Sequence, residues 1–160
     1  LVQLRRLDGL LEAMRQRKRM LRSGMEEVAR RKGVVFQEIP DPQGEAAVAL
    51  IFFMENSTLA QKVAEALSAE NIGAGVLYRP DSVDYHVYTH WTPIMNQRTW
   101  TPKGGPWRWA QRPIQYTPDM CPRTLDLLGR AVHLNVNPLL TNQDIEETVE
   151  GLNDVLEALA

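Results

Sequence analysis

The sequence has only one cysteine, Cys121, and no run of 18 consecutive apolar residues. One cysteine cannot form a disulfide within the chain, so we expect a structural thiol in a reducing compartment. A bilayer-spanning helix needs about 20 apolar residues, and neither such a segment nor a secretory leader is recognisable. These absences predict a cytoplasmic protein that does not associate with a membrane.

Several catalytic signatures are also absent. There is no G-x-S-x-G nucleophile motif and no phosphate-binding loop with a K-[ST] ending, and "IGAGV" is too short for a dinucleotide fingerprint. His86 and His90 stand four residues apart in "HVYTH", which lacks the glutamate of the H-E-x-x-H zinc motif and any evident third ligand. We expect no metal site, and we interpret both histidines as loop residues that hydrogen-bond a ligand or a partner. His133 alternates within an apolar strand pattern, which predicts a histidine beside the core.

Charge is unevenly distributed along the chain. Residues 1–32 contain ten lysines and arginines against four acidic residues, whereas residues 33–160 contain eight against sixteen. A basic start is typical of nucleic-acid-binding arms, but also of a solvated helix face or a helix that meets an acidic neighbour. The four tryptophans and nearby arginines would suit single-stranded nucleic acid. Because the balance outside the first helix is acidic and the aromatics lie in one loop, we expect no nucleic-acid partner.

Hydrophobic periodicity and turn residues predict alternating helices and strands in one domain. The predicted helices lie near residues 1–32, 56–67, 121–131 and 141–159, and the predicted strands lie within residues 33–46, 46–55, 72–80 and 131–138. Asn56 or Ser57 is the expected N-cap of the second helix, and Thr141 with Asp144 predicts a capped start for the last one. The uninterrupted apolar run in residues 46–55 predicts a strand covered on both faces.

A long irregular segment from Pro80 to Pro122 contains all four tryptophans. Structureless loops beyond about 15 residues are uncommon in compact domains and are usually functional or disordered. Its core, "HVYTHWTPIMNQRTW", has neither helical nor strand periodicity, and ordering such a loop costs conformational entropy. The tryptophans argue against disorder, so we expect this loop to face a ligand or a partner that covers it.

The chain begins inside a helical pattern, without an initiator methionine or an N-cap residue. A natural N-terminus is rarely of this kind. We therefore expect a fragment of a longer polypeptide, whose preceding part supplies the surface against which the first helix packs.

Three segments, in this order, are similar to characteristic parts of one family. "QLRRLDGLLEAMRQRKRML" resembles an inter-domain helix, "NIGAGVLYRP" is similar to a Gly-Ile-x-Thr-x-x-His-Tyr-x-Pro segment, and "RAVHLNVNPLLTNQDIEETVEGL" is similar to a closing LP-x-HP-x-LT-x-x-D strand, turn and helix. Together they resemble the C-terminal part of the DegT/StrS sugar aminotransferases, which are fold type I pyridoxal-phosphate enzymes. The second segment departs from that pattern at Asn71, Ala74 and Leu77, and matches it at Ile72, Tyr78 and Pro80.

The resemblance implies an α/β fold of the α+β sandwich type, with a long N-terminal helix and helices packed on a small, mostly antiparallel sheet of three to four strands. Residues 1–32 would be an inter-domain or dimer-type helix, and residues 33–160 the small C-terminal aminotransferase domain with a loop insertion at 80–121. Family members carry the Schiff-base lysine in an N-terminal large domain. Pyridoxal 5'-phosphate is therefore implied for the full-length enzyme and not for this fragment alone, which is expected to be inactive.

The implied partners are that large domain, a second copy in a homodimer, a keto-sugar or related cyclic substrate, and glutamate or glutamine as the amino donor. In the intact enzyme we expect Tyr78, His86, His90, Trp91 and Arg98 near the substrate, because rings exclude water and donors orient a ligand in a cleft. Arg98 would offer a bidentate fork to a carboxylate or phosphate. The alternative is a non-catalytic binding or oligomerisation module whose basic helix pairs with another copy or an acidic partner.

Overall fold

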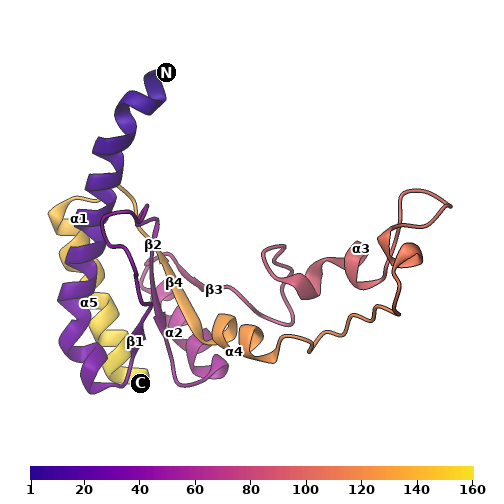
Figure 1. Ribbon diagram of the computed structural model, residues 1–160. Coiled ribbons are helices and arrows are strands. Elements are labelled where there is room, and N and C mark those ends of the chain that lie inside the picture. The colour runs from indigo at the N-terminus through magenta and orange to yellow at the C-terminus, as the bar shows by residue number, and fades with distance from the viewer. The chain divides into compact units, whose positions relative to one another are not determined.

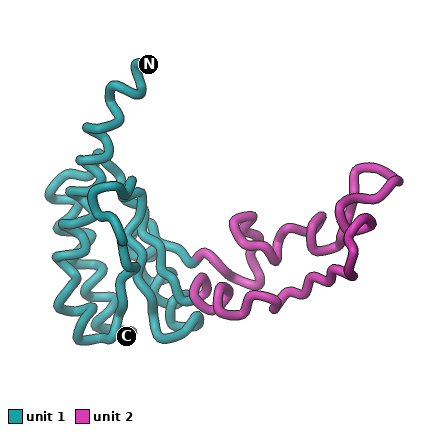
Figure 2. Tube along the Cα trace, viewed as in Figure 1, with its two compact units in different colours: residues 1–76, 130–160 teal, residues 77–129 magenta.

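The computed structural model describes residues 1–160, which divide into two compact units. Unit 1 comprises residues 1–76 and 130–160, and unit 2 comprises residues 77–129 (Figure 2). Unit 1 therefore contains both termini, and unit 2 is an insertion between two strands of its sheet.

Unit 1 contains three helices and a four-stranded antiparallel sheet, which confirms the expected fold class (Figure 1). The elements in chain order are α1 (Val2–Arg31), β1 (Val35–Phe36), β2 (Ala49–Phe53), α2 (Ser57–Ala69), β3 (Ala74–Val76), β4 (Ala131–Asn135) and α5 (Asn142–Leu159). The strand predicted within residues 72–80 ends at Val76. None of the helices is both long and apolar enough to cross a membrane.

The strand order β1-β2-β4-β3 places the last strand of the chain between two earlier ones. Leu50 of β2 lies opposite Leu134 of β4, which lies opposite Ala74 of β3 on its other side. The chain therefore leaves a gap beside β2 as it passes through α2 to β3, and β4 fills this gap after the insertion.

The core lies on one face of the sheet. Buried side chains of β2 and β4 pack there with buried side chains of all three helices: Leu50, Phe52, Val132, Leu134, Leu21, Met25, Val63, Leu67, Leu152 and Leu156. On the other face, Ile51, Phe53 and His133 are only partly buried. The expectation that residues 46–55 are covered on both faces is therefore not met within unit 1, because its three helices all pack on the same face of the sheet.

Helix α1 changes its environment along its length. Leu21, Met25 and Ala29 are fully buried, whereas Leu4 and Leu7 in the first two turns are 68% and 42% exposed. All belong to one apolar stripe of helical periodicity. Figure 1 shows the N-terminal turns of α1 extending beyond the rest of unit 1.

The cations of α1 are used mainly within unit 1. The Lys18 ammonium donates to Glu45 at 2.6 Å, and Arg31 forms an ion pair with Glu157 of α5. Lys32, just after the helix, donates to the backbone oxygen of Ala160 at 2.9 Å. Of the interpretations of the basic start, these contacts favour a helix that meets acidic neighbours, and the neighbours lie in the same chain.

Two predicted helix caps are confirmed. The Asn56 side chain accepts a hydrogen bond from the Leu59 amide at the start of α2. Thr141 and Asp144 form a reciprocal capping box at the start of α5. Such caps satisfy amides that have no partner inside the helix, so both starts are encoded locally.

Unit 2 is less irregular than expected. It contains the short helical turns η1 (Tyr88–His90), α3 (Thr92–Met95) and η2 (Pro106–Trp109), followed by α4 (Pro122–Arg130), which leads into β4. Pro122 stands at the first position of α4, as predicted, where its missing amide costs no hydrogen bond. Unit 2 contains no strand and has one buried apolar side chain, Val87, so backbone and side-chain hydrogen bonds must stabilise much of it.

Candidate functional site

Asp84 lies just before the "HVYTH" segment and contacts both of its histidines. Its carboxylate Oδ1 accepts the His86 amide at 2.8 Å and lies 2.7 Å from His86 Nδ1. The backbone of Asp84 faces His90 instead, with its nitrogen 3.0 Å and its oxygen 2.8 Å from His90 Nδ1. One residue therefore anchors both imidazoles through their Nδ1 atoms and leaves both Nε2 atoms without a partner.

The carboxylate of Asp84 determines the tautomer of His86. The hydrogen bond from the His86 amide, reinforced by the His86 ring, lowers the pKa of Asp84 below its ordinary value. An ionised carboxylate can only accept hydrogen bonds, so the proton of a neutral His86 ring must lie on Nδ1. Nε2 of His86 is then an acceptor on a side chain that is 90% exposed.

His90 is held by backbone atoms of Asp84, and its Nδ1 can either donate or accept a hydrogen bond. Nδ1 can accept from the Asp84 amide or donate to the Asp84 carbonyl, because both backbone atoms lie within hydrogen-bond distance. A ligand at Nε2 can therefore meet either a donor or an acceptor without breaking the Nδ1 contact. The Tyr78 ring lies against His90, with centroids 6.3 Å apart and an angle of 35° between the planes.

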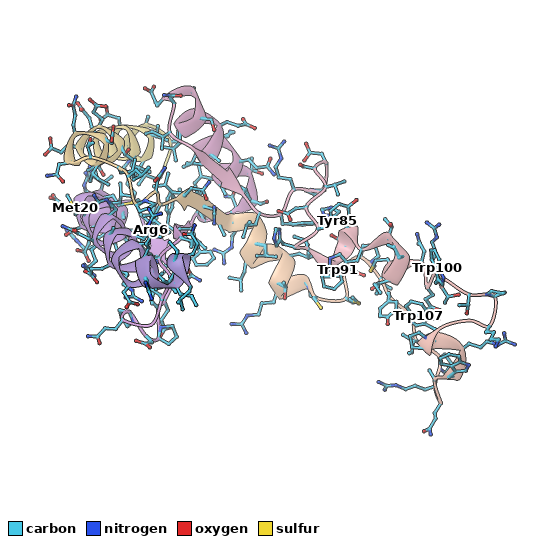
Figure 3. The ribbon with its side chains drawn as sticks, turned by 90° about the horizontal axis from the view of Figure 1, so that it is seen from above. Arg6, Met20, Tyr85, Trp91, Trp100 and Trp107 are labelled. Atoms are coloured by element: carbon cyan, nitrogen blue, oxygen red, sulfur yellow. The ribbon has the colours of Figure 1, made fainter.

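Trp91 follows His90 and turns back along the same loop. Its Nε1 donates to the backbone oxygen of Tyr85 at 2.6 Å, and the two residues lie close together in Figure 3. The indole remains 43% exposed. Four of the five predicted residues thus lie within one loop, Tyr78 to Trp91, where Asp84 and the Tyr85 carbonyl hold three of them.

The Arg98 side chain forms no hydrogen bond or ion pair with this loop. Its amide donates to Pro93 at 2.8 Å, which closes the turn after α3, and its side chain is exposed without a hydrogen-bond or ion-pair partner. The structure therefore offers no anchoring for the guanidinium, which stays available to an anion.

Two residues that organise the candidate site, Asp84 and Tyr88, were not predicted from the sequence. Asp84 makes the hydrogen bonds that hold His86 and His90. The Tyr88 hydroxyl connects the first part of unit 2 to its last part, because it donates to the Pro118 carbonyl at 2.7 Å and accepts from the Cys121 amide at 3.2 Å. The D-x-H spacing in "DYHVYTH" was the available signal for Asp84, since aspartate side chains commonly accept the amide two residues on. No local pattern pointed to Tyr88, whose partners lie about 30 residues away.

The lysines of the chain do not form a pyridoxal-phosphate site. Lys18 borders a cavity of about 450 Å³ in unit 1, but its ammonium is paired with Glu45. Lys32 is held by the end of α5, and Lys62 and Lys103 are not enclosed by a cavity. Pyridoxal phosphate requires a free lysine amine in an enclosed site with groups that bind its phosphate, and none of these lysines meets that requirement.

No group of three or more histidine, cysteine or acidic residues could hold a metal ion.

Comparison with solved structures identifies the fold. The aminotransferase TlmJ from Streptoalloteichus hindustanus matches 99% of this chain with 35% of its own, at a TM-score of 0.65 and 16% identity. Spr1654 from Streptococcus pneumoniae, described as a putative sugar aminotransferase, matches 100% of this chain with 34% of its own, at a TM-score of 0.65 and 14% identity. A DegT/DnrJ/EryC1/StrS aminotransferase from Brucella abortus matches 94% with 32% of its own, at a TM-score of 0.57 and 18% identity.

The chain therefore has the fold of part of an aminotransferase, and it spans about a third of the length of these proteins. No family model matches the sequence. The resemblance noted in the sequence to the DegT/StrS aminotransferases is confirmed at the level of the fold, where it extends over almost the whole chain.

Proposed function

We propose that this chain is the C-terminal small domain of a pyridoxal-phosphate-dependent aminotransferase that transfers an amino group to a keto-sugar or a related cyclic substrate. One observation carries the proposal: aminotransferases match nearly the whole chain with only a third of their own length. The sugar class of substrate rests on Spr1654, which is described as a putative sugar aminotransferase, and on the sequence resemblance.

The separate roles of this chain and of a larger domain follow from the residues that this chain contains and lacks. Its lysines do not fit the cofactor, so a larger domain must supply the lysine and the phosphate cradle. When bound there, the cofactor provides the electron sink for amino transfer. Residues of this chain would bind and orient the substrate and exclude water, and we propose glutamate or glutamine as the donor and a homodimer as the assembly.

Each site residue then has a role that its contacts allow. The His86 Nε2 accepts a hydrogen bond from a substrate hydroxyl, because Asp84 holds the ring proton on Nδ1. The His90 Nε2 can donate or accept a hydrogen bond, and the Tyr78 and Trp91 rings cover apolar substrate surface. Arg98 has no partner in the chain and would bind a carboxylate or phosphate with two parallel hydrogen bonds.

The test compares this chain alone with the chain joined to its larger domain. We expect amino transfer from glutamate or glutamine to a keto-sugar only in the joined form, together with the absorbance of the cofactor imine. In that form His86→Ala should raise KM by about tenfold, the value of one lost hydrogen bond of about 1.4 kcal/mol. Arg123→Ala, an exposed change on α4, is the matched control and should leave KM unchanged. Amino transfer by these 160 residues alone would refute the proposal.

A second candidate, a non-catalytic oligomerisation module, is favoured by one observation. Apolar side chains at the start of α1 are exposed to solvent: Leu1, Val2, Leu4, Leu7 and Leu10. An apolar patch of this kind is typical of a surface that another chain covers. If the natural protein lacks any cofactor domain and the double variant Leu4→Ser/Leu7→Ser abolishes self-association, this candidate replaces the first.

A further inference from the structure

One loop of unit 2 carries exposed indoles among unpaired cations. Residues 85–118 contain no acidic residue. Within them, Trp100 is 100% exposed and Trp109 is 70% exposed. The neighbouring cations Lys103 and Arg112 have exposed side chains and no hydrogen-bond or ion-pair partner. We define the tip as Trp100, Lys103, Arg108, Trp109 and Arg112.

A contact between Trp107 and Tyr116 stabilises the conformation of the tip. Trp107 Nε1 donates to the Tyr116 hydroxyl at 3.0 Å, and the two rings meet edge to face with centroids 6.5 Å apart. Trp107 and Trp100 lie at the same end of unit 2 in Figure 3. Two residues after this anchor, Trp109 is left facing solvent. A pre-shaped loop loses less entropy on binding than a flexible one, so the exposed rings are well suited to contact a partner.

Unit 1 presents a groove of complementary character between α2 and α5. The groove has a volume of about 360 Å³ and an apolar floor that includes Val155, Ala158 and Leu159. Its rim carries Glu70 and Asp154, whose exposed carboxylates have no partner within the chain.

The helices around this groove strengthen its negative character. Helix α5 contains six acidic residues and no basic one; Glu157 is paired with Arg31 and Lys32 and Asp144 caps the helix start, which leaves four that can act near the groove. Helix α2 ends at Ala69 beside the groove, without a basic residue in its last turn. The C-terminal end of a helix has a partial negative charge, so this end of α2 adds to the attraction for a cation. An apolar floor with a carboxylate rim fits an indole flanked by lysine or arginine side chains.

We propose that the tip of one copy of this chain docks in the α2–α5 groove of a second copy. Both surfaces lie on the same sequence, so each copy offers one tip and one groove to other copies. A buried tryptophan contributes roughly 150–250 Å². A single tip therefore falls short of the about 1,200 Å² that a standard interface buries, and areas below that value are typical of weak or transient contacts. The association is accordingly weak and sensitive to salt.

Charge reversal on each side, followed by mixing, tests this docking. Glu70→Lys/Asp154→Lys reverses the groove, and Arg108→Glu/Arg112→Glu reverses the tip. By sedimentation equilibrium, each reversed variant alone should self-associate at least about tenfold more weakly than the original chain, because its tip and its groove then carry like charges. A mixture of the two variants can join opposite charges, so it should form a heterodimer more tightly than either variant associates with itself.

Controls separate this contact from other kinds of association. Glu146→Lys on α5 and Arg123→Glu on α4 are exposed charge reversals outside the groove and the tip, and they should leave the dimer unchanged. Trp100→Ala/Trp109→Ala should weaken it with the circular dichroism spectrum preserved. Three results would overturn the proposal: a monomer at all concentrations, reversed variants that associate as tightly as the original chain through α1, or a tip that binds single-stranded DNA and leaves the dimer unaffected when mutated.

Discussion

His86 Nδ1 lies 2.7 Å from the carboxylate of Asp84, which also accepts the amide of His86. This double contact holds the imidazole in one orientation and one tautomer, although its ring is otherwise exposed to solvent. A similar organisation is common in functional histidines, where the hydrogen bond at one nitrogen determines the chemistry of the other.

Replacement of Asp84 by asparagine should allow both neutral tautomers of His86. The side-chain oxygen of the introduced amide could still accept from Nδ1, but its nitrogen could also donate to an unprotonated Nδ1, so both tautomers become possible. Nitrogen chemical shifts should then show a mixture at His86 in place of the Nδ1–H form. His133, which lies on β4 in unit 1, is the internal control and should not change. An unchanged His86 spectrum would contradict the assigned role of Asp84.

Lowering the pH should loosen the turn in which Asp84 accepts hydrogen bonds from His86. The pKa of Asp84 is lowered in the folded chain by the His86 amide, so its stabilising contribution is fully present above the unfolded value of about 3.9. As the pH falls below that value and through the folded pKa, protonation removes the contribution. Amide chemical shifts and line widths of His86 should therefore change below about pH 4. The Asp84→Asn variant should not show this acid transition.

Glu45 should matter more for stability than Glu12, although each is paired with a cation of α1. Lys18 is 7% exposed, so removal of Glu45 leaves a nearly buried ammonium without its partner. We expect Glu45→Ala to lower the free energy of unfolding by about 2 kcal/mol, less than for a fully buried pair because Glu45 itself is partly exposed. Glu12→Ala breaks an exposed pair with Arg19 and should cost less than about 0.5 kcal/mol.

A third variant separates charge from packing at this pair. Because Lys18→Met/Glu45→Ala removes both charges and keeps most of the apolar stem, it should recover most of the stability that Glu45→Ala loses. Urea denaturation measures all three variants. Equal effects of Glu45→Ala and Glu12→Ala would show that the burial of Lys18 is unimportant.

The capping box of α5 should contribute about 1 kcal/mol to the free energy of unfolding. Thr141→Ala removes the oxygen that accepts the Asp144 amide at 3.1 Å, and that amide then has no partner inside the helix. Thr58→Ala, in the first turn of α2, is the matched control, since its exposed side chain makes no hydrogen bond. Thermal unfolding should distinguish the two. A loss no larger than in Thr58→Ala would mean that water replaces the cap without cost.

The helix starts were predictable because their causes are local. Asn56, Thr141, Asp144 and Pro122 lie within a few residues of the amides that they satisfy or replace, so the sequence pattern contains the whole interaction. The organisation of the site was only half predictable. Tyr78, His86, His90 and Trp91 were predicted from their chemistry and remain a prediction, whereas the Tyr88 hydroxyl finds its partners at Pro118 and Cys121 only after the chain has folded.

The sequence by itself determined the helix caps, the apolar stripe of α1, the approximate strands and the chemical character of the loop, since each depends on neighbouring residues. Tertiary structure alone decided that β4 enters between β2 and β3, that only one sheet face is covered, and that Lys18 is buried against Glu45. These features arise from residues far apart in the chain. Their free energies depend on which surfaces meet, and periodicity contains no information about that pairing.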